Sequence, residues 1–187
     1  MLTWLVFGSY AVFFLTEILL NRRLRSQSTD QPGQDKNSIT LIWVTIPVAI
    51  FVAIFLAHNT PFQLYHNVNF VCVGVALIFL GIALRFVAIY TLGRFFTVDV
   101  TIRQGHALKR DGLYHYLRHP SYAASLLSFI GMGYTFNNWL SLLVLVAAVL
   151  AAFRYRIRVE ERALIAHFGE EYLAYKRATP GLLPFIW

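Results

Sequence analysis

The sequence predicts an all-α, polytopic membrane protein with about five transmembrane helices. Of its 187 residues, 58% are hydrophobic and 13% are charged, whereas soluble globular domains contain about 45–50% apolar and about 25% charged residues. Five apolar segments account for this excess, and the basic residues collect in alternate connections between the segments. The composition excludes a disordered chain and disfavours a soluble globular enzyme.

The first three apolar segments are each long enough to cross the hydrocarbon core of a bilayer, which takes about 20 helical residues. They are Leu2–Leu20, Ile39–Ala57 and Val68–Leu92, and the third contains Arg85. No basic region precedes the first segment, and no small-residue cleavage signal follows it. We therefore expect a retained span there and not a signal peptide.

Two shorter apolar segments follow, Ser121–Phe136 and Trp139–Phe153, and Asn137-Asn138 separates them. Residues 121–153 contain no charge and are too long for one straight span. Asparagine is favoured in tight turns. The pattern therefore predicts a helical hairpin that turns at the two asparagines.

The basic residues predict how these segments are oriented. Of the 16 lysines and arginines, all but Arg85 lie in residues 21–38, 93–120 and 154–187, and Arg85 is about two turns from the same end of its segment. By the positive-inside rule, this distribution places the N-terminus outside and the C-terminal region in the cytoplasm, with an odd number of spans. The net charge of +7 then reflects membrane topology, and we expect no nucleic-acid partner.

The chain therefore divides into two parts. Residues 1–92 are predicted to form three transmembrane helices. Residues 93–187 are predicted to contain a polar loop, the hairpin 121–153 and a charged, amphipathic cytoplasmic helix.

Polar residues near the predicted membrane surface are candidates for a site. Pro120 suits the first position of a helix, and the residues before it expose N–H groups at the positive end of the helix dipole. Arg156 and Glu160 are four residues apart, so they share a helix face. Such a pair can bind a zwitterionic ligand or can pair internally, and Glu160 can equally be a solvated charge.

Several common sites are not predicted. The histidine pair His115 and His119 lacks a glutamate between its members, and Pro120 interrupts the helix that a zinc motif needs. We therefore expect no metal site. Cys72 is the single cysteine, so no intrachain disulfide can form. The sequence contains no G-x-G-x-x-G, no Walker loop and no G-x-S-x-G, so Rossmann-type binding and serine hydrolysis are not supported.

A set of short motifs in the second half of the chain carries a resemblance. In order, they are Gly105-His106-x-Leu108, Gly112-x-Tyr114, Arg118-His119-Pro120-Ser121-Tyr122, Glu160-Glu161, Phe168-Gly169-Glu170-Glu171-Tyr172-x-x-Tyr175 and Leu183-Pro184-Phe185-Ile186. The set resembles the isoprenylcysteine carboxyl methyltransferase family of integral membrane enzymes. It is also similar to the broader group that contains the phospholipid N-methyltransferases.

The resemblance implies that residues 93–187 form a methyltransferase core with a cytoplasmic S-adenosyl-L-methionine site. Arg156 and Glu160 are the implied catalytic residues, and Arg156 would bind the acceptor. By its position, Asp99 is a further candidate to line the cofactor pocket. The implied cofactor-binding residues are His106, Ala107, Leu108, Lys109, Tyr114, His119, Pro120, Ser121, Tyr122 and Glu160.

The implied acceptor is the carboxylate of a prenylated cysteine or a similar lipophilic molecule, which the enzyme would bind from the membrane lipid. A carboxylate is already ionised at neutral pH, so methyl transfer to it needs no general base. One alternative is a phospholipid N-methyltransferase, whose amine acceptor must first lose a proton. Others are a sterol-reductase-like reductase that uses NADPH and a non-catalytic membrane protein that keeps the fold. The short chain favours the methyltransferase.

Overall fold

The computed structural model describes residues 2–24, 37–101, 105 and 107–182. Every regular element in these residues is helical, which confirms the predicted all-α class. The elements are α1 (Leu2–Arg23), α2 (Ser38–Asn59), η1 (Val68–Phe70), α3 (Val71–Leu92), η2 (Gly93–Phe95), α4 (Leu113–Tyr116), α5 (Pro120–Thr135), α6 (Trp139–Phe168) and α7 (Glu170–Ala178).

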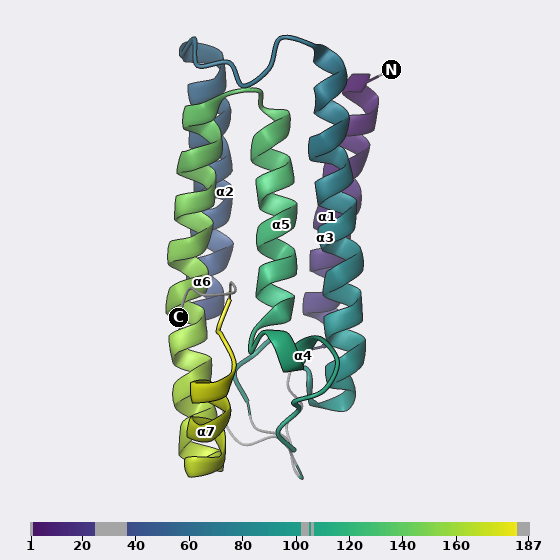
Figure 1. The fold of residues 1–187 in the computed structure, drawn as a ribbon. Coiled ribbons are helices and arrows are strands. Elements are labelled where there is room, and N and C mark those ends of the chain that lie inside the picture. The colour runs from purple at the N-terminus through teal and green to yellow at the C-terminus, as the bar shows by residue number, and fades with distance from the viewer. Residues whose placement is uncertain (1, 25–36, 102–104, 106, 183–187) are drawn as a thin grey trace.

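Five long helices form an up-and-down bundle (Figure 1). The helix α5 packs against both α3 and α6, while α1 packs on α3 and α2 packs on α6. Glycines allow α3 and α5 to approach closely. A Cβ atom at Gly81 would lie 2.6 Å from the carbonyl oxygen of Ala124, and one at Gly74 would lie 2.7 Å from that of Gly131. Small residues commonly bring membrane helices together in this way.

Among the described residues, four helices are long and apolar enough to cross a membrane: α1, α2, α3 and α6. The fifth helix of the bundle, α5, has 16 residues, which corresponds to about 24 Å at 1.5 Å per residue. It lies beside α3 and α6 along the bundle (Figure 1). The number of spans therefore remains a prediction.

The last long helix differs from the sequence expectation. The predicted apolar segment ends at Phe153, but α6 continues without a break to Phe168 and has 30 residues. Its second half keeps Val159 and Ala163, four residues apart on one face, buried, which is the pattern of an amphipathic helix. The helix ends at Gly169, whose φ of 55° favours glycine, and α7 follows.

The turn between α5 and α6 lies at Asn137 and Asn138. Asn137 has a φ of 52°, a conformation that asparagine tolerates better than most residues. The side chain of Asn138 accepts a hydrogen bond from the backbone N–H of Ser141 at 3.0 Å, which caps the start of α6.

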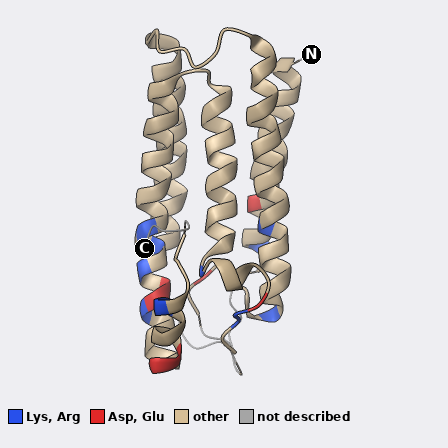
Figure 2. Ribbon diagram, viewed as in Figure 1, with Lys and Arg blue, Asp and Glu red and all other residues tan. Residues whose placement is uncertain are grey.

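Charged side chains gather toward one end of the bundle (Figure 2). That end contains the finish of α1 and α3, the start of α2 and α5, and the second half of α6. The described connections at the other end, residues 60–67 and 136–138, contain no lysine, arginine, aspartate or glutamate. The helix packing thus brings the basic segments of the sequence to a single end.

Candidate active site

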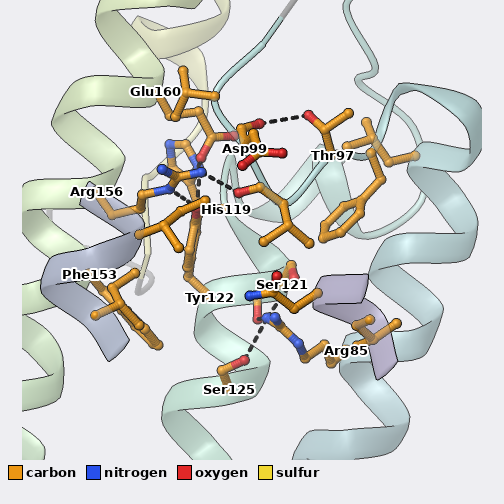
Figure 3. Close-up of a pocket in the computed structure, with 18 of the residues that line it drawn as sticks. Arg85, Thr97, Asp99, His119, Ser121, Tyr122, Ser125, Phe153, Arg156 and Glu160 are labelled. Atoms are coloured by element: carbon orange, nitrogen blue, oxygen red, sulfur yellow. Dashed lines mark hydrogen bonds and ion pairs between the residues drawn. The ribbon is translucent and has the colours of Figure 1, made fainter. Parts of the chain in front are cut away.

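A cavity of about 210 Å³ lies at the charged end of the bundle. Parts of α1, α2, α3, α5, α6 and the segment 95–101 line it. In Figure 3, Arg156 and Glu160 lie in the upper part of the view, Arg85 and Ser125 lie in the lower part, and Tyr122 is between them. The side chains that α1 and α2 contribute are largely apolar and include Phe13, Phe14, Ile42, Trp43 and Ile46.

Most of the residues nominated from the sequence reach this cavity. Those that line it are Leu108, Lys109, Tyr114, His119, Ser121, Tyr122, Arg156 and Glu160, together with Asp99. Two others do not: Ala107 is exposed to solvent, and Pro120 is buried at the start of α5. His106 lies outside the residues that the structure describes.

The C-terminal segment holds the start of α5 in place. The backbone N–H of Arg118 donates to the carbonyl of Pro180 at 2.9 Å, and that of His119 donates to the carbonyl of Gly181 at 3.0 Å. Proline at the first position of α5 needs no backbone donor there. These bonds fix the chain just before Ser121 and Tyr122, both of which line the cavity.

Tyr122 links the two nominated charges of α6. Its hydroxyl donates to Glu160 Oε2 at 3.0 Å and accepts from Arg156 Nε at 3.2 Å. Arg156 is 2% exposed and also donates to Ser38 Oγ and to the carbonyl of Val98. The guanidinium is therefore fixed on the cavity wall by contacts with α2, α5 and the segment 95–101.

The adjacent carboxylate, Glu161, has a different environment that sequence reasoning did not identify. It is 6% exposed, and its oxygens accept from Arg118 Nε at 2.9 Å and from Lys176 Nζ at 2.6 Å. His119 Nε2 lies 3.3 Å from the same carboxylate, and the hydroxyl of Tyr172 donates to it at 3.4 Å. Because four groups from two segments, the start of α5 and α7, meet on Glu161, this residue ties both segments to α6.

A second ion pair in the cavity wall was also missed. Arg85 of α3 and Glu17 of α1 form a two-pronged contact, with Nε–Oε1 at 2.8 Å and Nη2–Oε2 at 2.9 Å. Arg85 Nη1 also donates to Ser125 Oγ at 2.6 Å and to Ser121 Oγ at 3.0 Å. The available signal was a glutamate inside the first predicted segment and an arginine inside the third, since ionisable residues within spans are rare and usually pair.

The tyrosines around the cavity are held in their neutral form. Burial, reinforced by the nearby Glu160 carboxylate, raises the pKa of Tyr114. Burial also raises the pKa of Tyr172, with Glu161 adding to the effect, and it raises the pKa of Tyr175 to about 12. The hydroxyl of Tyr175 donates to the carbonyl of Tyr114. These phenols remain hydrogen-bond donors throughout the physiological range of pH.

The arrangement can bind a ligand that carries charges of both signs beside an apolar part. Glu160 Oε2 receives Tyr122, whereas Oε1 has no hydrogen-bond partner among the described residues. Arg156 supplies positive charge from the same helix. Within the described part of the chain, no group of three or more histidines, cysteines or carboxylates could hold a metal ion.

A family model described as the isoprenylcysteine carboxyl methyltransferase family matches residues 73–166. Protein-S-isoprenylcysteine O-methyltransferase B of Arabidopsis thaliana is 36% identical over 115 residues, which cover 60% of this chain and 58% of that protein. The Rattus norvegicus protein-S-isoprenylcysteine O-methyltransferase is 38% identical over 115 residues, covering 60% of this chain and 40% of its own. The matched region spans about half the length of these relatives.

A solved structure shares the fold. It is the eukaryotic intramembrane Ras methyltransferase ICMT without a monobody, with a TM-score of 0.61 and 23% sequence identity. The match covers 100% of this chain and 68% of that one. The similarity therefore extends to α1 and α2, for which the motifs of the sequence gave no signature.

Proposed function

The chain belongs to the isoprenylcysteine carboxyl methyltransferase family, and we propose that it is an S-adenosyl-L-methionine-dependent methyltransferase. Its proposed acceptor is the carboxylate of a prenylated cysteine or a similar lipophilic molecule. The observation that carries this proposal is one cavity that combines the charged groups of Arg156 and Glu160 with the apolar side chains of α1 and α2. A multi-pass membrane protein gives such a cavity access to lipophilic molecules.

The charged groups of the cavity support S-adenosylmethionine as the cofactor. When bound, S-adenosylmethionine supplies the methyl group. The open Oε1 atom of Glu160 suits a cationic ligand, because a carboxylate binds ammonium through charge-assisted hydrogen bonds. The other residues proposed to hold the cofactor are His106, Ala107, Leu108, Lys109, Tyr114, His119, Pro120, Ser121 and Tyr122. Ala107 and Pro120 would act indirectly, because their backbone positions the neighbouring residues that line the cavity.

The role proposed for Arg156 is to attract and orient the acceptor carboxylate. Its contacts with Ser38, Val98 and Tyr122 hold its charge at the cavity wall, so little reorganisation is needed when an anion arrives. A carboxylate with a reference pKa of about 4 is ionised at neutral pH. The main task of the protein is then alignment of the reacting groups, which can supply about 7–11 kcal/mol of the barrier reduction.

The apolar part of the cavity is the proposed site for the hydrocarbon chain of the acceptor. Phe13 of α1, Ile46 of α2 and Phe129 of α5 line it and are nearly fully buried in the bundle. Burial of apolar carbon stabilises a complex by about 25 cal/mol per Å². A lipid chain placed here would bring its polar end toward Arg156.

We further propose that the charged end of the bundle faces the cytoplasm. The clustering of the basic residues at that end (Figure 2) supports this orientation through the positive-inside rule. The N-terminus would then lie outside, and the cofactor site would open to the cytoplasm.

Calorimetry of the purified protein tests the proposed reaction class. We expect saturable binding of S-adenosylhomocysteine and no binding of NADPH. Binding of NADPH with no binding of S-adenosylhomocysteine would contradict the methyltransferase proposal and favour the reductase alternative.

A further inference from the structure

One outward face of α6 changes from apolar to basic along its length. In the first half of the helix, Leu143, Ala147 and Ala151 are exposed at intervals of four residues. In the second half, the exposed positions with the same spacing are Arg154, Arg158 and Arg162. Residues four apart lie on neighbouring positions of a helix surface, so the arginines continue the apolar face. We call Arg154, Arg158 and Arg162 the arginine stripe.

The stripe brackets the position at which α6 is expected to leave the hydrocarbon core. A core of about 30 Å takes about 20 residues of a straight helix, which would place the edge near Arg158 when counted from Trp139. Arg156, in the same turn, donates to the hydroxyl of Ser38, the first residue of α2. The stripe is therefore level with the end of a neighbouring span.

Two members of the stripe, Arg158 and Arg162, have no assigned role inside the protein. None of the three arginines lines the cavity. Arg158 and Arg162 form no hydrogen bond or ion pair with another described residue, although several other arginines of the chain are paired with glutamates. Both side chains are exposed, whereas Arg156 and Glu161 on the same helix are buried.

We propose that the arginine stripe binds the phosphate groups of anionic phospholipids in the leaflet at the charged end of the bundle. The guanidinium group has a planar set of donors that matches phosphate oxygens. Anionic headgroups attract basic residues placed at the membrane surface. An anionic lipid is favoured over an acidic protein because the stripe continues a face whose first half is exposed and apolar. A lipid on that face can contact both parts of it.

Lipid selectivity in reconstituted bilayers tests this proposal. Spin-labelled phosphatidylglycerol and phosphatidylcholine report the relative association of each lipid with the full-length protein. We expect the wild-type protein to prefer phosphatidylglycerol, and Arg158→Gln/Arg162→Gln to lose most of that preference, up to about five-fold per arginine at low salt. Raising the salt concentration should weaken the wild-type preference, because ions screen exposed charges.

Arg177→Gln is the matched control, since it removes the same charge as one stripe variant from a 71% exposed side chain on α7. We expect Arg177→Gln to keep the lipid preference that Arg158→Gln weakens. Equal association of the two lipids with the wild-type protein would overturn the proposal. So would a preference that Arg158→Gln and Arg177→Gln reduce equally, or one that does not change with salt.

Discussion

Glu160 and Glu161 are neighbours in the sequence but occupy different environments. Glu161 is buried and accepts from Arg118, Lys176 and other donors. Glu160 is partly exposed, with 32% of its side chain accessible, and it lines the cavity. Successive helix residues point about 100° apart, so one faces the ligand space while the other ties segments together.

Replacement of Glu160 tests the ligand-binding role. We expect Glu160→Gln to weaken binding of S-adenosylhomocysteine by roughly 10- to 100-fold, because a hydrogen bond to a charged group contributes about 1.5–3 kcal/mol. The thermal unfolding temperature should change little. Calorimetry on the folded variant measures the affinity, and an unchanged affinity would assign Glu160 to a solvated surface.

Glu161→Gln is the matched control for that variant. It leaves Arg118 without its carboxylate in a site where the two side chains are 4% and 9% exposed. Loss of one partner from a buried ion pair costs about 3–5 kcal/mol. We therefore expect a clearly lower unfolding temperature, measured by circular dichroism in detergent. The same unfolding temperature as the wild type would contradict the tying role of Glu161.

Arg156 requires a conservative variant, because its side chain also supports packing. Arg156→Ala removes donors to Ser38, Tyr122 and Val98, so we expect lower stability as well as lower turnover. Arg156→Lys keeps the charge but lacks the planar fork, and we expect partial turnover with nearly normal cofactor affinity. Equal turnover for Arg156→Ala and the wild type would contradict the acceptor role.

At the scale of elements, the contact between α3 and α5 depends on the absence of side chains at glycine. A Cβ at Gly81 would approach the backbone of Ala124 and Ser128 at 2.6 and 2.8 Å, whereas one at Gly8 would meet no atom within 4 Å. We expect Gly81→Ala to destabilise the protein by about 1–3 kcal/mol through overpacking.

Gly8→Ala serves as the control for this prediction. It should leave stability unchanged or raise it slightly, because alanine favours helix over glycine by about 1 kcal/mol. Thermal unfolding of the two variants in the same detergent makes the comparison. Equal effects of the two substitutions would show that the separation of α3 and α5 does not depend on Gly81.

The helices could be predicted from the sequence because their apolar length and turn residues are local properties. The turn at Asn137 and Asn138 is an example. The sequence does not predict the extension of α6, because its change from apolar to charged residues at Arg154 is also typical of a helix end. A helix that continues as an amphipathic segment and a helix that ends show the same change from apolar to charged residues. Only the packing of the segment against its neighbours distinguishes the two cases.

The contacts of the site were less accessible to sequence reasoning. Glu17 and Arg85 are 68 residues apart, and Ser38 and Arg156 are 118 apart. Such pairs depend on which helices pack together, and that arrangement is not a local property of either segment. The resemblance to a known family therefore nominates Arg156 and Glu160. The sequence does not identify the residues that hold their side chains in place.

At the scale of the whole molecule, the distribution of charge predicts orientation. A reporter fused after Trp187 should be active on the cytoplasmic side, and one placed before Met1 should report the opposite side, because the basic residues gather at one end. An extracytoplasmic signal from the C-terminal fusion would contradict the proposed cytoplasmic site.

The pH dependence of activity separates a carboxylate acceptor from an amine. The pKa of Tyr114 is raised and that of Tyr175 is about 12, so both phenols stay protonated well above neutral pH. Their ionisation should therefore not alter activity between about pH 6.5 and 9. A carboxylate acceptor is ionised over the same range. An amine acceptor would instead give a rate that climbs toward the pKa of the amine.

The most direct test is therefore a parallel methylation assay of a farnesylated cysteine analogue and phosphatidylethanolamine, followed over that range of pH. We predict methylation of the farnesylated cysteine alone, at a rate that does not require high pH and that falls sharply in Arg156→Ala. Methylation of phosphatidylethanolamine alone, with a rate that rises with pH and with Arg156→Ala fully active, would contradict the carboxyl methyltransferase assignment.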